Sequence, residues 1–177
     1  GYLLVTPLQL AYATATLANR GRAIRPRLLR GLENPGSGAI THPAQRRGLS
    51  VENKDSSTWD RVIAGMESVL HGSRGTARAS GRNSPYRIAG KTGTAQVVSI
   101  PEDWDNRSDE LPEELRDHAL FIAFAPVEQP RIAIAVVVEN GGSGSRVAAP
   151  IARKIMDYYF IDRLRRASLP GIANVFG

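Results

Sequence analysis

The chain has 177 residues, of which 42% are hydrophobic and 23% charged, as is ordinary for one globular domain with a sizeable core. It contains no cysteine, which excludes disulfides and thiolate metal sites. The net charge of +6 suits an anionic polymer or headgroup as a partner. No motif of interleaved aromatic and basic residues supports nucleic-acid binding, so no nucleic acid is expected as a partner.

We expect neither a membrane-spanning segment nor a signal peptide within these 177 residues. Its longest apolar run, Ile132 to Val138, is far too short to cross a bilayer. Gly1-Tyr2-Leu3 follows no basic segment and no initiator methionine, so no signal peptide begins the chain. We therefore expect a piece of a longer protein, with any membrane anchor lying upstream.

The N-terminal segment predicts a helix that begins at Pro7. Thr6 can cap its free backbone N–H groups, Pro7 suits the first helical position, and Gln9 completes a capping box. Apolar residues recur at helical spacing as far as Ala18. Gly21 then follows as a typical C-terminal stop.

The next part of the chain predicts one further helix between loops. Residues 24–32 indicate an irregular or edge strand, because Pro26 cannot donate to a β-ladder, and residues 33–50 are typical of a loop. Ser57-Thr58-Trp59-Asp60 is expected to cap a second helix, which ends at the connection 72–85, rich in glycine and serine. The apolar face of this helix comprises Val62, Ile63, Met66, Val69 and Leu70.

The second half predicts three strands, at about 86–99, 118–126 and 131–139. The turn at 127–130 is so short that the last two strands must be antiparallel. A helix from about 145 to 166 should cover one face of the sheet. The fold class is therefore α+β, an antiparallel sheet of three consecutive strands covered by helices. The apolar stripe of the last helix is formed by Val147, Ile151, Ile155, Met156 and Tyr159.

The run Lys91-Thr92-Gly93-Thr94 at the first of these strands is the most informative motif. Lys91 would place a positive charge beside a nucleophile, and the hydroxyls of Thr92 and Thr94 can hold a carboxylate. The backbone N–H of Thr94 can face a developing oxyanion. Gly93 would let a backbone or a flat ligand approach closely. Lys-Thr-Gly is one of three marker motifs of serine acyl-transferases that react with penicillins, although alone it is a weak signal.

The wider sequence resembles the transpeptidase domain of class B penicillin-binding proteins. Residues 88–97 resemble the third sheet strand of that family, and residues 118–126 and 130–142 resemble the next two strands. Thr6-Pro7-Leu8-Gln9-Leu10 is similar to the segment before its helical stretch. The resemblance covers nearly the whole chain and implies a penicillin-binding/β-lactamase-like transpeptidase fold.

Two features favour the elongation branch of the family, penicillin-binding protein 2. One is Leu115-Arg116-Asp117-His118 after a long acidic insertion, and the other is the strand exit Glu139-Asn140-Gly141-Gly142. The insertion, residues 102–117, holds eight of the chain's 17 acidic residues. Because so many acids cannot be buried unpaired, we expect it to be exposed and to project over or beside the cleft.

The resemblance implies the reaction of a peptidoglycan D,D-transpeptidase. A serine attacks a stem peptide ending in D-Ala-D-Ala, and an amine of a neighbouring stem resolves the acyl-enzyme. In the family that serine lies in Ser-x-x-Lys and a second motif is Ser-x-Asn, yet neither pattern occurs in these 177 residues. We therefore expect residues 1–177 to be the C-terminal portion of a single transpeptidase domain, with the nucleophile upstream and the isolated fragment inactive.

By the same resemblance, Lys91 and Thr94 would be catalytic, and Thr92, Gly93 and Thr94 would bind substrate. The plain alternatives are a solvated edge-strand lysine and ordinary β-propensity of the threonines. His118 is expected to be an ordinary histidine at a strand start, because metal sites need more ligands at fixed spacing. For Gly75-Thr76-Ala77, the rim of a cleft and a simple loop are equally open.

The implied partners are stem peptides, β-lactams and membrane proteins of the elongation machinery. No cofactor or metal is expected. The implied location is the periplasmic side of the bacterial inner membrane. Two other functions stay open, a penicillin-recognising hydrolase or sensor of the same fold and a non-catalytic binding module with a basic surface.

Overall fold

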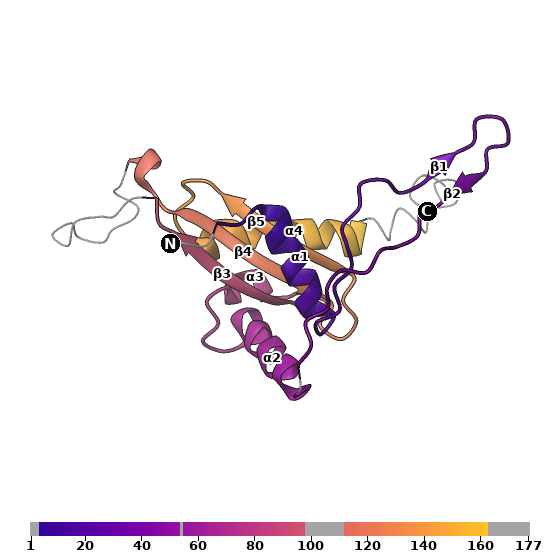
Figure 1. Ribbon diagram of the computed structural model, residues 1–177. Coiled ribbons are helices and arrows are strands. Elements are labelled where there is room, and N and C mark those ends of the chain that lie inside the picture. The colour runs from indigo at the N-terminus through magenta and orange to yellow at the C-terminus, as the bar shows by residue number, and fades with distance from the viewer. Residues whose placement is uncertain (1–3, 54, 98–111, 163–177) are drawn as a thin grey trace.

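The computed structural model describes three stretches of the chain, residues 4–53, 55–97 and 112–162. Within them, three longer strands form a central sheet, and two short strands form a separate hairpin. In Figure 1, α1 (Pro7–Ala18) lies in front of the central sheet, α4 (Ala149–Asp157) behind it and α2 (Ser57–His71) below it. The sheet is therefore covered by helices on both faces.

The central sheet consists of β3 (Ala89–Ala95), β4 (His118–Ala125) and β5 (Ile132–Val138). The strands pair antiparallel in the order β3-β4-β5, which confirms both the predicted strand arrangement and the α+β class. β3 begins later than predicted, because the backbone N–H of Ile88 donates to His71 Nε2 at 3.0 Å instead of joining the ladder. Residues 98 and 99 of the predicted strand lie outside the described residues.

Side chains of β4 alternate between two hydrophobic cores. Phe121 and Ala123 are fully buried and belong to the core that includes Met156 of α4. Phe124 is fully buried in the other core, with Ala18 of α1 and with side chains of α2. The strand is thus the central element to which both helical layers are attached.

The start of α1 forms as its sequence predicts. Thr6 Oγ1 accepts from the backbone N–H of Gln9 at 3.2 Å, and Gln9 Oε1 accepts from the backbone N–H of Thr6 at 2.8 Å. Pro7 occupies the first turn, where its missing N–H costs no hydrogen bond. Just after the helix Gly21 adopts φ +88°, a conformation that favours glycine.

The start of α2 differs from its prediction. The N-cap residue is Ser56, whose side chain makes no capping bond. Asp55 instead accepts from the backbone N–H of Ser57 at 2.9 Å and from its hydroxyl at 2.8 Å. These bonds lower the pKa of the Asp55 carboxyl, since both favour its charged form. Of the predicted apolar face Ile63, Met66 and Leu70 are buried, whereas Val62 is 41% exposed.

The last helix starts where expected, but the predicted apolar stripe is wrong in part. A π-helical turn at Gly144–Ala148 precedes α4, and a second one follows at Tyr158–Asp162. Ile151 and Ile155 are 39% and 43% exposed. The wider first turn changes the rotation per residue, so a stripe counted at regular α-helical spacing falls on the wrong face. The buried residues here are Ala148, Ala149, Ala152 and Met156.

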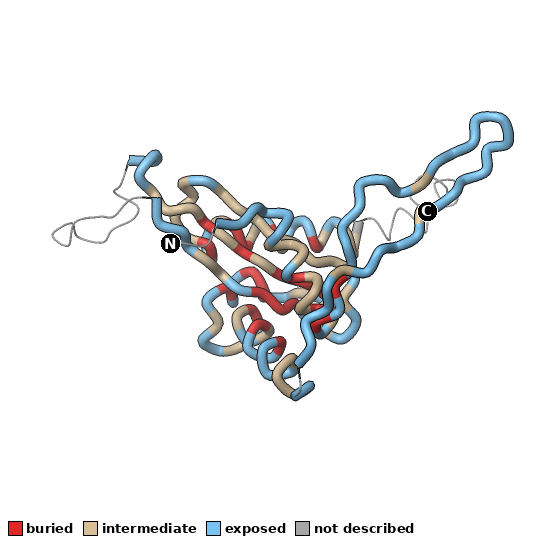
Figure 2. Tube along the Cα trace, in the orientation of Figure 1, coloured by how far each residue is buried: buried red, intermediate tan, exposed pale blue. Residues whose placement is uncertain are grey.

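Residues 22–51 form an extended arm that projects from the body of the protein (Figure 2). The predicted edge strand at 24–32 is wrong except at its ends, because only an isolated bridge at Ile24 and the start of β1 (Leu32–Glu33) form there. β1 pairs antiparallel with β2 (Ile40–Thr41), which lies inside the predicted loop 33–50. Closer to the body, Ile24 and Arg47 form an isolated antiparallel bridge. Most of the arm's residues are exposed in the structure.

Candidate active site

The predicted catalytic run lies on β3, which pairs only with β4 in the part of the chain that the structure describes. Thr92 lies opposite Phe121, on the α4 side of the sheet, and Thr94 shares that side. Lys91 lies opposite Ile122, on the side of α1 and α2. At an edge strand, side chains from both faces can reach the space beside the sheet. The run is therefore placed where a ligand can be held along the strand.

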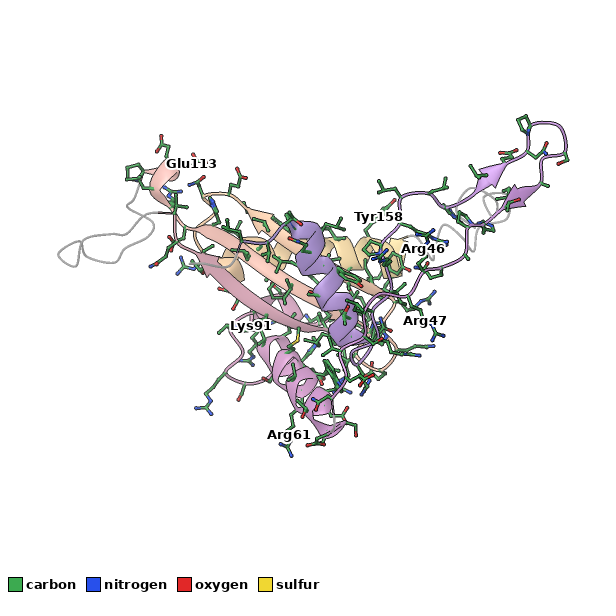
Figure 3. The ribbon with its side chains drawn as sticks, in the orientation of Figure 1. Arg46, Arg47, Arg61, Lys91, Glu113 and Tyr158 are labelled. Carbon is green, nitrogen blue, oxygen red and sulfur yellow. The ribbon has the colours of Figure 1, made fainter. Side chains whose placement is uncertain are left out.

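Lys91 is exposed, and its ammonium group is held close to the strand. Its Nζ donates to the backbone carbonyl oxygen of Thr92 at 2.7 Å. Figure 3 shows Lys91 on the side of the sheet where α2 lies. A cation in this position can act on an anionic ligand at the edge of β3, because it is open to solvent and not neutralised by an ion pair within the described residues.

Thr92 connects β3 to the segment between α2 and α3 (Arg78–Gly81). Its Oγ1 lies 3.2 Å from the Oγ1 of Thr76, and either hydroxyl can be the donor. From the sequence alone, Gly75-Thr76-Ala77 could form either the rim of a cleft or a simple loop. The hydroxyl contact places Thr76 beside the candidate site. Thr94 is exposed near the end of β3, opposite Ala119.

Another backbone segment lies close to Gly93, as expected, but the missing side chain of Gly93 is not what permits this approach. The neighbour is Gly144, where an added Cβ would lie 2.4 Å from the carbonyl oxygen of Gly93 and 2.5 Å from that of Leu120. An added Cβ at Gly93 itself would meet only Leu120 Cβ, at 3.2 Å. The missing side chain that permits the approach is thus that of Gly144, which brings the start of the last helix against the strand.

A hydrogen-bonded junction fixes the segment that leads into β4. His118 begins β4, as predicted, and its Nδ1 accepts from the backbone N–H of Asn140 at 2.9 Å. The Asn140 side-chain amide donates to the carbonyl oxygens of Glu114 and Arg116 at 3.0 and 3.1 Å. Asn140 has φ +53°, a left-handed conformation that asparagine tolerates. His118 therefore has a structural role at the point where the acidic segment joins the sheet.

The acidic insertion is described only at its C-terminal end, since residues 98–111 lie outside the described residues. Glu113 and Glu114 form part of a 3₁₀ turn and are exposed, as expected. Figure 3 shows Glu113 at the end of the molecule opposite the arm, where Arg46 lies. The position of the whole insertion relative to the site stays a prediction.

A second polar network, which the sequence did not indicate, fixes the segment before β3. Tyr86 donates from its hydroxyl to Asp157 Oδ1 at 2.5 Å, and Arg153 Nε donates to the two oxygens of Asp157 at 2.8 and 2.9 Å. Arg153 also donates to the carbonyl oxygen of Ser80 at 2.8 Å, at the end of α3. Burial, and then the hydrogen bond to Asp157, raise the pKa of the Tyr86 phenol well above its ordinary value.

The described residues contain neither a cluster of metal ligands nor a helix able to span a membrane. There, no three His, Asp or Glu side chains are grouped so that they could hold a metal ion. None of the helices in the same stretches combines the length and apolar character needed to cross a bilayer.

Comparison with known proteins defines the class. The profile of the penicillin binding protein transpeptidase domain matches residues 1–157. The chain therefore belongs to the penicillin-binding protein transpeptidase family, and the resemblance seen in the sequence is confirmed.

Individual relatives indicate the branch of this family to which the chain is most similar. The chain is 40% identical over 166 residues to the peptidoglycan D,D-transpeptidase MrdA of Haemophilus influenzae, covering 93% of this chain and 25% of the relative. The crystal structure of Pseudomonas aeruginosa PBP2 in complex with WCK 5153 matches with a TM-score of 0.74 and 44% identity, over 93% of this chain and 31% of that one. The complex of PBP2 and MreC from Helicobacter pylori matches with a TM-score of 0.68 and 28% identity, over 90% and 25%.

These names confirm the predicted penicillin-binding protein 2 branch, and the structures confirm the transpeptidase fold. The chain spans about a quarter of the length of the curated relatives that it matches. The activity of the whole protein is therefore a matter for proposal.

Proposed function

We propose that residues 1–177 are the C-terminal portion of the transpeptidase domain of a peptidoglycan D,D-transpeptidase, which cross-links stem peptides during cell-wall elongation and binds β-lactams. The observation that carries this proposal is the Lys91-Thr92-Gly93-Thr94 run on the edge strand β3, with Lys91 and Thr94 exposed. Membership of the transpeptidase family and 40% identity to a peptidoglycan D,D-transpeptidase support the reaction.

The proposed mechanism is nucleophilic acyl transfer. A serine outside this chain attacks the carbonyl of the penultimate D-Ala, the terminal D-Ala leaves, and an acyl-enzyme forms. An amine of a neighbouring stem peptide then attacks the acyl carbonyl and frees the serine. A β-lactam acylates the same serine, but its leaving group stays attached by a covalent bond.

The residues of β3 have distinct proposed roles. The cation of Lys91 keeps the site electropositive and orients hydroxyl groups of the serine-bearing portion. The hydroxyls of Thr92 and Thr94 bind the terminal carboxylate of the substrate, and Gly93 leaves room for the flat peptide backbone. The backbone N–H of Thr94 stabilises the oxyanion of the tetrahedral intermediate, an interaction made only as the charge develops.

The proposal extends to partner and place. A complex of PBP2 with MreC is among the structural relatives, so a membrane protein of the elongation machinery is the proposed partner. The proposed location is the periplasmic side of the inner membrane, where the peptidoglycan substrate lies.

The test uses the longer protein that carries this chain. Lys91→Ala should lower the second-order rate of labelling by a fluorescent penicillin about 100-fold, as for loss of a group that stabilises developing charge. The control is Lys154→Ala, because Lys154 is an exposed residue of α4 and should leave labelling unchanged. Absence of labelling in the wild-type protein would favour a non-catalytic binding module. Rapid release of the label would favour a hydrolase.

A further inference from the structure

Thr76 is held in place by the residues on both sides of it. Ala77 is 1% exposed and its backbone N–H donates to the carbonyl oxygen of Val69, in the last turn of α2, at 2.9 Å. On the other side, Gly75 packs so tightly that an added Cβ would lie 2.4 Å from the same carbonyl oxygen and 2.5 Å from that of Ser68. The backbone at Thr76 is therefore fixed against α2, which is itself packed on the sheet.

This anchoring presents the Thr76 hydroxyl to β3. Its Oγ1 lies 3.2 Å from the Oγ1 of Thr92, while the carbonyl oxygen of Thr92 accepts from Lys91 Nζ at 2.7 Å. Thr76 is exposed and Thr92 is half-buried, so the pair lies at the surface of the site. The two contacts hold Thr92 by its side chain and by its backbone.

A hydroxyl has one proton to donate and two lone pairs to accept with. If Thr92 donated its proton to Thr76, it would present only lone pairs to an anionic ligand. If Thr76 donates to Thr92, the Thr92 proton stays available for a carboxylate oxygen. An anion selects this second orientation, and in such a chain each hydrogen bond strengthens the next.

We propose that Thr76 is a positioning residue for substrate binding, which donates its hydroxyl proton to Thr92 so that Thr92 can donate to the substrate's terminal carboxylate. This inference rests on the proposed function and adds to it a residue outside the Lys-Thr-Gly motif. It predicts a loss that depends on the negative charge of the ligand. A purely structural role of Thr76 would affect charged and uncharged ligands alike.

The experiment measures acylation of the longer protein by benzylpenicillin and by its methyl ester, which lacks the carboxylate charge. Thr76→Val keeps the shape of the side chain but removes the hydroxyl, whereas Thr76→Ser keeps the hydroxyl. We expect Thr76→Val to slow acylation by benzylpenicillin about fivefold to tenfold, the size of one hydrogen bond between two neutral groups, because the bond that is lost joins two hydroxyls. Acylation by the ester should change less than about twofold, and Thr76→Ser should stay close to wild type.

A second variant tests the route through Thr92. In a Thr92→Val background, Thr76→Val should cause no further loss, because the hydroxyl that it positions is gone. Equal slowing with both ligands, unchanged acylation by benzylpenicillin, or additive losses in the double variant would overturn the inference and leave the proposed function standing. A wild-type protein that neither ligand acylates would overturn both.

Discussion

The hydroxyl of Tyr86 donates a 2.5 Å hydrogen bond to the carboxylate of Asp157, across 71 residues of sequence. Tyr86 lies just before β3, and Asp157 is the last residue of α4. The ring of Tyr86 also packs against Phe160, with 4.7 Å between ring centroids. These contacts fix the start of the strand that carries the candidate site to the helix behind the sheet.

Replacing Tyr86 by Phe should lower the free energy of unfolding by about 1 kcal/mol, because the ring is kept and one hydrogen bond is lost. The folded state raises the pKa of the Tyr86 phenol, so its contribution is complete below about pH 10, the ordinary tyrosine pKa. The contribution is lost as the pH rises through the higher folded-state value. Urea unfolding at pH 8 and at pH 10–11 should show a steeper decline for wild type than for Tyr86→Phe. Parallel curves would contradict this interpretation.

Arg153 should contribute more than Tyr86 to the free energy of unfolding, since it makes several hydrogen bonds that join α4 to the C-terminal end of α3. Its guanidinium binds both oxygens of Asp157 and the carbonyl oxygens of Ser80 and Arg82. Arg153→Met should lower the unfolding free energy by about 2–3 kcal/mol, because a half-buried carboxylate loses its cation. The matched control, Lys154→Met at the next and exposed position, should change it by less than about 0.5 kcal/mol. Similar losses of unfolding free energy in both variants would show that the hydrogen bonds of Arg153 contribute little to stability.

Two glycine substitutions should act in opposite directions. Gly144→Ala would bring a methyl group against the carbonyl oxygens of Gly93 and Leu120, and should lower the unfolding free energy by about 1–3 kcal/mol. Gly65→Ala, within α2, meets nothing within 4 Å and should raise it by about 0.5–1 kcal/mol. Thermal unfolding of the two variants measures the difference. A neutral Gly144→Ala would mean that the last helix can move away from β3 without cost.

The arm should be cut early by trypsin, because its backbone is exposed and largely without a sheet partner. The peptide bond after Arg30 is the expected first site among the described residues, whereas the bond after Arg25 should resist because Pro26 follows. Mass spectrometry of a short digest identifies the cut. A first cleavage after Arg153 instead would indicate that the helical layer opens more readily than the arm.

The isolated chain should not form a stoichiometric covalent adduct with a penicillin. None of its serines has a lysine three residues later, so each hydroxyl lacks the base that activates the family's nucleophile. Intact-mass measurement after incubation with benzylpenicillin provides the check. A single clean adduct on one of these serines would contradict the assignment of Lys91 and Thr94 to a site completed by another segment.

Local signals in the sequence determined much of this protein. The capping box of Thr6 and Gln9 forms as predicted, because both partners lie within one helical turn. The short turn at 127–130 required β4 and β5 to be antiparallel, and the Lys91-Thr92-Gly93 run lies on the expected strand. Each of these features depends on residues close together in the chain, where geometry leaves few alternatives.

The tertiary structure decided which side chains meet. The helical spacing predicted that Ile151 is a core residue, yet it lies at the surface. The wide turn at Gly144–Ala148 changes which side chains of the last helix face the sheet, and most of the buried ones are small alanines. The pairing of Thr76 with Thr92, and that of Tyr86 with Asp157, join segments that no local pattern relates. Such contacts depend on how the helices pack against the sheet. This packing is set by the volumes of side chains that come from distant parts of the chain.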